Sequence, residues 1–150
     1  MLTLALDATP LLGDRTGIGV AVSGLVAGLA ERPDLSIVAY GLSARRWRLL
    51  RAALPPGLRL ARGPMPAGPL LAAWSRWDLP PVELWSGGVD VVHGTNFVVP
   101  PTRRAARVVT VHDLTVVRFP EMCDPPTLRY PALLRRAIAH RTHDDRPLRL

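Results

Sequence analysis

The stretch Asp7-Ala-Thr-Pro-Leu-Leu-Gly-Asp-Arg-Thr-Gly-Ile-Gly19 decides how the first part of this chain folds. It follows an apolar run at residues 2–6, and we expect a buried parallel strand over 2–8. It precedes apolar residues at helical spacing, which predict an amphipathic helix over 17–31. The residues alone leave two interpretations open. The loop over 13–19 either lines a crevice that receives an anion at the helix N-terminus, or is an ordinary strand-to-helix turn.

The composition limits the class of protein. The chain has 150 residues, of which 48% are hydrophobic, enough for one domain with a core and too many for a disordered chain. The formal net charge is +7, yet all 19 basic residues are arginine, which points to GC-rich codon usage. Dense basic clusters interleaved with aromatic residues are absent from the sequence, so we expect no specific nucleic-acid partner.

Cysteine usage and hydropathy indicate the compartment. Cys123 is the single cysteine, which excludes an internal disulfide and fits a reducing environment. The N-terminus lacks the basic region of a signal peptide, and no apolar stretch is long enough to span a bilayer. We therefore expect a cytoplasmic protein that is soluble or bound at the inner face of the membrane.

Predicted strands and helices alternate along the rest of the chain. Further strands are expected over 35–41, 58–61, 89–93 and 107–112, and further helices over 43–54, 70–77, 82–86 and 126–139. This order predicts an α/β fold with a doubly wound, mainly parallel, Rossmann-like sheet. We place a single domain at 1–139 and a non-homologous or disordered tail at 140–150.

The predicted helix over 43–54 carries arginines on one side and apolar residues on the other. Arg45, Arg48 and Arg51 form the basic side. One interpretation is a peripheral membrane contact through these arginines. The alternative, which general base rates favour, is a surface helix whose apolar side meets the sheet.

Polar side chains follow three of the predicted strands. They lie over 13–19, at 93–96 and at His112-Asp113. Ligands of parallel sheets bind beyond the carboxyl ends of the strands, so these clusters predict a shared crevice. In the tail, His140 and His143 precede two aspartates, which is a conceivable metal site. We expect an unpacked tail and no metal.

Three pieces of the sequence carry a resemblance to a known family. They are "LDATPLLGDRTGIGVAVSGLVAGLA", "DVVHGTNFVVPP" and "RVVTVHDLTVVRFPE". Together they resemble the N-terminal domain of retaining glycosyltransferases of the two-Rossmann-domain type, glycosyltransferase family four, over 2–139. The resemblance implies an acceptor-side domain of an enzyme that transfers a hexose, mannose or glucose, from a nucleotide-sugar to a carbohydrate or lipid-linked acceptor. The nucleotide-sugar is a co-substrate, and no cofactor is implied.

The resemblance also implies which residues meet the donor. Gly17, Ile18 and Gly19 would lie near the donor diphosphate. Arg15 is a further candidate for this charge, because oriented N–H groups and a guanidinium stabilise a leaving diphosphate without a metal.

The other implied roles concern the reacting sugar and the acceptor. His112 would form a hydrogen bond to a donor hydroxyl at the catalytic centre, with Asp113 supporting its loop, while Asn96 and His93 would line the acceptor side. Without the resemblance, the residues favour a packed histidine at a strand end for His112 and a cap or turn residue for Asp113, whereas the resemblance favours a functional His112.

The chain departs from the family after residue 139. The family continues into another strand and then a donor-binding domain, neither of which follows here. We therefore expect a truncated product that is inactive alone. The alternative is a non-catalytic binding or interaction module that uses the same crevice.

Overall fold

The computed structural model describes residues 1–13 and 16–139 as one α/β domain. Its strands are β1 (Leu2–Asp7), β2 (Leu35–Tyr40), β3 (Arg59–Leu60), β4 (Val91–Gly94) and β5 (Ala106–Val109). They form one sheet in the order β3-β2-β1-β4-β5, and all of its pairings are parallel. The prediction of an α/β fold with a parallel sheet is confirmed.

β1 is the central strand of the sheet. Its last four residues are buried. It pairs with β2 on one edge, where Asp7 lies opposite Tyr40, and with β4 on the other, where Leu6 lies opposite His93. A strand that is covered on both faces carries a continuous apolar run rather than an alternating one, which is the pattern of this segment.

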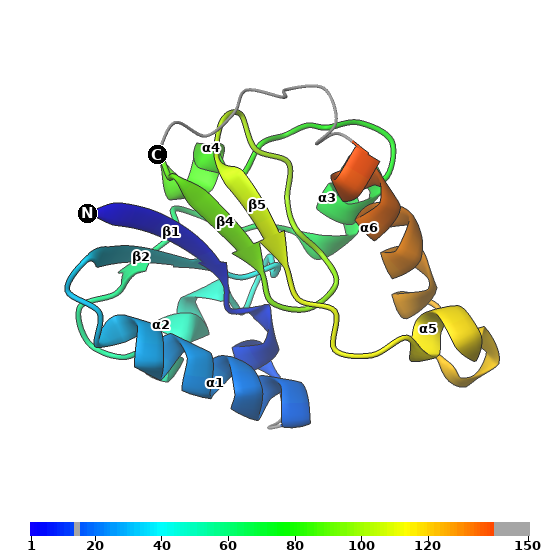
Figure 1. Cartoon of the computed structure of the whole chain (residues 1–150), viewed down its shortest axis with the longest axis horizontal. Coiled ribbons are helices and arrows are strands. Elements are labelled where there is room, and N and C mark those ends of the chain that lie inside the picture. The colour runs from blue at the N-terminus through cyan, green and yellow to red at the C-terminus, as the bar shows by residue number, and fades with distance from the viewer. Residues whose placement is uncertain (14–15, 140–150) are drawn as a thin grey trace.

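Helices pack against both faces of the sheet. The helices of the described residues are α1 (Gly17–Ala30), α2 (Leu50–Ala53), α3 (Ala67–Trp74), α4 (Glu83–Ser86), α5 (Thr115–Arg118) and α6 (Tyr130–Ala139). Of these, α5 contacts α6 and lies away from the sheet (Figure 1). In Figure 1, α1 and α2 lie below the sheet, and α3 and α6 lie to its right. Val22 and Val26 of α1 share a core with Leu6, whereas Trp74 of α3 and Leu133 of α6 belong to a second core that contains Tyr40 and Ala5.

α1 begins as the sequence predicts. It starts at Gly17 and ends at Ala30, one residue before the predicted end. The Thr16 hydroxyl accepts a hydrogen bond from the amide of Gly19 at 3.3 Å and caps the helix. The β4–β5 connection over 95–105 contains no helix.

The prediction of one helix over 43–54 is wrong. Only a 3₁₀ turn over Trp47–Leu49 and the four-residue α2 form there. The Ser43 hydroxyl accepts the amide of Arg46 at 2.9 Å, which is the bond of a helix N-cap, but residues 44–46 form no helical turn after it. Leu50 is fully buried and anchors the segment, while Leu49 is 58% exposed.

Two other predicted elements end earlier than expected. α3 ends at Trp74, which is buried, so Trp77 lies beyond the helix and is exposed. β5 ends at Val109, which leaves His112 in an exposed segment after the strand rather than in it. The predicted tail over 140–150 lies outside the described residues.

Candidate ligand pocket at the carboxyl edge of the sheet

A pocket with several polar groups lies where the strand order changes direction. The chain runs from β1 to β2 and β3 on one side, and then returns to β4 and β5 on the other. Loops that leave β1 and β4 therefore diverge, and such a switch point is where parallel sheets bind ligands. A pocket of about 390 Å³ lies there, lined by the loops after β1, β2 and β4 and by α1, α3 and α6.

Asp7 is the acidic group of this pocket. It ends β1, and only 3% of it is exposed. Its Oδ1 accepts hydrogen bonds from the Thr9 amide at 2.8 Å and from the Thr9 hydroxyl. The Leu42 amide donates to the same hydroxyl at 2.9 Å, which holds Thr9 in place. Burial raises the pKa of Asp7 to about 6, although the bonds from Thr9 act in the opposite direction.

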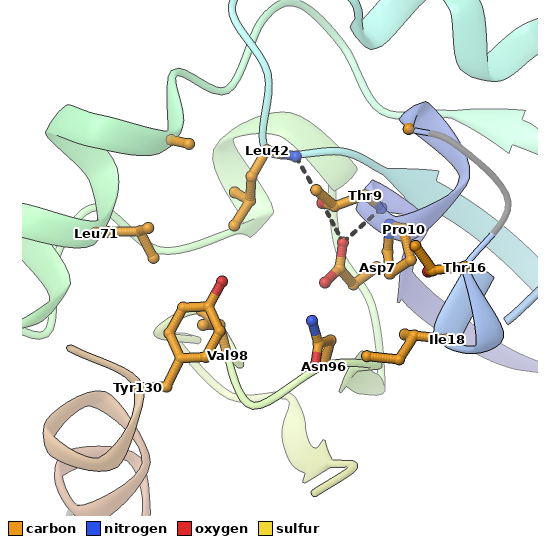
Figure 2. Close-up of a pocket in the computed structure, with 12 residues that line it drawn as sticks. Asp7, Thr9, Pro10, Thr16, Ile18, Leu42, Leu71, Asn96, Val98 and Tyr130 are labelled. Carbon is orange, nitrogen blue, oxygen red and sulfur yellow. Dashed lines mark hydrogen bonds between the residues drawn. The ribbon is translucent and has the colours of Figure 1, made fainter. Parts of the chain in front are cut away.

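The other carboxyl oxygen of Asp7 faces the pocket. Within residues 1–13 and 16–139, no hydrogen bond reaches Oδ2. Figure 2 shows the Asp7 carboxyl, the Asn96 amide and the Tyr130 hydroxyl directed at the same space. Burial, and to a smaller degree Asp7, raise the pKa of Tyr130, so its hydroxyl is a neutral donor.

The loop after β4 has a constrained backbone that places Asn96. A Cβ atom added to Gly94 would lie 1.9 Å from the carbonyl oxygen of Val98, so only glycine fits there. Phe97 is buried with a φ of 59°, which is rare for a bulky residue. Its ring stacks on Tyr130 with centroids 5.8 Å apart. Strained, over-determined positions of this kind cluster at ligand sites.

His112 and Asp113, the predicted catalytic pair, do not line this pocket. The Nε2 atom of His112 lies 2.9 Å from the carbonyl oxygen of Thr95, which requires the Nε2–H tautomer for a bond. The Thr95 hydroxyl in turn donates to the carbonyl oxygen of Asp7 at 2.8 Å. Asp113 accepts the Thr115 amide at 2.8 Å and so stabilises the turn before α5. His112 therefore reaches the pocket only through Thr95.

The remaining predicted residues divide between the pocket and its surroundings. Ile18 and Asn96 line it. Gly17 starts α1, and Gly19 is buried with its amide bound by the helix cap. Arg15 lies outside the described residues.

His93 occupies the third position of β4 and does not line the pocket. Its Nε2 atom lies 2.8 Å from the Thr110 hydroxyl. Burial lowers its pKa, so it stays neutral at physiological pH.

Sequence reasoning missed three residues of this pocket. The sequence shows Asp7 as an acidic residue at the end of an apolar strand. A carboxylate in such a buried position is costly unless it is paired or hydrogen-bonded, which could have marked it as a candidate site residue. Thr9 follows it at the spacing of a side-chain-to-backbone turn. Tyr130 had no comparable sequence signal, because only the packing of α6 brings it to this edge.

No protein-family profile, curated protein or solved structure matches this chain. In the described part of the chain, no three His, Cys, Asp or Glu side chains are grouped so that they could hold a metal ion. None of the helices described here has the length and apolar character needed to cross a membrane.

Proposed function

We propose that this chain is the acceptor-side domain of a retaining glycosyltransferase with a doubly wound, Rossmann-like fold. The observation that carries the proposal is the pocket at the strand-order switch. Its volume of about 390 Å³ suits one small ring, and a few polar groups converge on it between apolar walls. This proposal agrees with the sequence resemblance, which assigns acceptor binding to this half of the enzyme.

The polar groups of the pocket match an uncharged polyhydroxylated ring. The free oxygen of Asp7 accepts a hydrogen bond from a ring hydroxyl, and Asn96 and Tyr130 supply donors. Leu42 and Val98 form apolar walls against which the C–H face of a sugar packs. A phosphate would be repelled by ionised Asp7, so the acceptor enters through hydroxyl groups.

In this proposal the donor diphosphate stays outside the pocket, at the start of α1. The first turn of a helix leaves backbone N–H groups unsatisfied, and its dipole favours an anion. Gly17 and Ile18 provide such groups, and Arg15 would add charge. His112 steadies Thr95 and thereby the loop that holds Asn96. The sugar itself comes from a second, donor-binding domain.

Asp7 has a specific role in the proposed acceptor site. Above pH 6 its carboxylate binds and orients the attacking hydroxyl of the acceptor. It is a positioning group, since in the family the leaving phosphate takes the proton. We place the activity in the cytoplasm.

A non-catalytic binding module is the second candidate function. The position of His112 favours it, because an exposed histidine bound to the Thr95 carbonyl is not aimed at the pocket. The same ring would then bind without any transfer.

Saturation-transfer NMR with uncharged methyl hexosides and cyclic polyols tests pocket binding. We expect signal at pH 7.5 that Asp7→Asn reduces and that the exposed control Asp124→Asn leaves unchanged. Equal signals in all three proteins contradict the pocket assignment.

A transfer assay separates the two functions. Binders from the first experiment are incubated with labelled nucleotide-sugars and this chain, alone and with an added donor-binding domain. Transfer only with the added domain supports the glycosyltransferase. Binding without transfer in either mixture favours the binding module.

A further inference from the structure

The positive charge of this chain is concentrated in one segment. Residues 35–77 hold seven arginines, at positions 45, 46, 48, 51, 59, 62 and 76, and no aspartate or glutamate. The rest of the chain carries 12 arginines and 12 acidic residues, so this segment accounts for the whole net charge of +7. Codon usage explains the choice of arginine over lysine, but it does not explain the absence of carboxylates from this segment.

Three of these arginines line a groove around the β3 edge of the sheet. The groove has a volume of about 450 Å³. Arg51 comes from α2, Arg59 from the edge strand β3, and Arg62 from the segment after it. Trp85 and Ser86 of α4 also line the groove, and the Arg62 amide donates a hydrogen bond to the carbonyl oxygen of Trp85 at 2.8 Å. None of the lining residues also lines the pocket at the carboxyl edge.

The guanidinium groups in this edge groove have no carboxylate partners within the described ranges. The described residues form two ion pairs, Arg32 with Asp34 and Arg107 with Asp78, and neither lies in the edge groove.

The arginines of the edge groove form only weak contacts. Arg51 donates to the carbonyl oxygen of Leu58 at 3.4 Å, and Arg59 to the Ser36 hydroxyl at 3.3 Å. These long bonds orient the side chains and leave most of their donors free. For the Arg62 guanidinium, the described residues provide no hydrogen-bond acceptor.

We propose that the edge groove binds a phosphate-bearing ligand with at least two phosphate oxygens in reach of separate arginines, such as a diphosphate or a phosphate monoester headgroup. A guanidinium presents paired N–H donors that match phosphate oxygens, and the three arginines that line the groove have no carboxylate partner among the described residues. The ligand is a soluble phosphate compound or the headgroup of an acidic lipid. This site is independent of the acceptor pocket and of the proposed transferase activity.

Two binding measurements on the full chain test this site. Isothermal titration calorimetry uses inorganic pyrophosphate as the probe. Co-sedimentation uses vesicles of phosphatidic acid in phosphatidylcholine, with pure phosphatidylcholine vesicles as the blank. The groove variant is Arg59→Gln/Arg62→Gln, and the control with the same loss of charge is Arg103→Gln/Arg104→Gln. All four arginines are exposed, so the fold tolerates both variants, and thermal unfolding verifies this.

We expect the groove variant to bind roughly tenfold more weakly and the control to stay within about threefold, because only the groove variant removes direct phosphate contacts. Loss in the pyrophosphate arm alone identifies a soluble ligand, and loss in the vesicle arm alone identifies a lipid headgroup. Equal weakening of binding in both variants would mean that net charge alone causes the effect, and it would overturn the proposed site. The absence of binding by the unaltered chain in both measurements would also overturn it.

Discussion

The pocket at the carboxyl edge and the edge groove are built from opposite chemistry. The pocket encloses a buried carboxyl group between apolar walls, and it takes side chains from both ends of the described chain. The charged residues of the groove are the exposed arginines Arg51, Arg59 and Arg62, all from one short segment.

Under the two proposals, this difference would separate two ligand classes within one small domain. An ionised Asp7 rejects phosphate from the pocket, and solvated guanidinium groups give an uncharged sugar little to bind in the groove. Burial also changes how the charges behave. The pocket depends on pH because burial shifts the pKa of Asp7, while the groove depends on salt because its arginines are exposed.

Substituting Gly94 with alanine has the largest expected effect, because it disrupts the pocket and leaves the edge groove intact. The new Cβ would collide with the carbonyl oxygen of Val98, so the loop that carries Asn96 must shift. We expect a loss of about 3 kcal/mol or more in the free energy of unfolding, measured with urea. Gly88→Ala, where a Cβ meets no atom within 4 Å, is the control. Similar losses in both variants would contradict the crowding at Gly94.

The Asp7→Asn variant sharpens the contrast in pH dependence. The folded-state pKa of Asp7 is raised from 3.8 to about 6, so the folded protein binds the proton more tightly than the unfolded chain. The unaltered protein therefore loses stability as pH rises from 4 to 6, and is most stable, as far as this group decides, below that window.

Asparagine removes this penalty and can still accept the bonds from Thr9. At pH 7.5 we expect the free energy of unfolding of the Asp7→Asn variant to exceed that of the unaltered chain by up to about 3 kcal/mol. The gain should vanish below pH 4, as urea titrations at several pH values will show. A gain that does not change with pH would mean that Asp7 does not titrate in this range.

Replacing Tyr130 with phenylalanine tests the two sites against each other. The ring keeps its stacking on Phe97, so stability should change by less than about 0.5 kcal/mol. Loss of one neutral hydrogen bond should weaken binding of a pocket ligand roughly fivefold. Pyrophosphate binding to the edge groove should be unchanged, and a parallel loss at both sites would show that they are coupled.

Added salt has the smallest expected effect, and we expect it to change ligand affinity at the edge groove but not at the pocket. Raising NaCl from about 50 mM to about 300 mM shortens the range of exposed charges, so pyrophosphate affinity should fall several-fold. Binding of an uncharged methyl hexoside to the pocket should stay the same. Calorimetry at the two salt concentrations measures both, and a salt-insensitive groove would mean that its arginines do not contact the ligand.

The candidate site was predicted in part. The sequence placed a crevice at the carboxyl ends of β1 and β4, and the pocket includes Ile18 and Asn96 as expected. The proposed catalytic role of His112 stays a prediction, and its hydrogen bond to Thr95 was not visible in the spacing. The helix over 43–54 was mispredicted, because the N-cap bond of Ser43 is present but only short helical turns follow at Trp47–Leu49 and Leu50–Ala53.

The sequence by itself determined the first strand, the loop and the capped helix α1, because apolar runs, helical spacing and a threonine cap act over a few residues. It also determined the excess of arginine in residues 35–77.

Only the tertiary structure decided which side chains meet. Asp7, Asn96 and Tyr130 converge because β4 pairs beside β1 and α6 packs over the same face. Arg51 and Trp85 share a groove because α2 and α4 cover opposite faces of the edge strand. Such contacts follow from strand order and packing between distant elements, which local patterns do not encode.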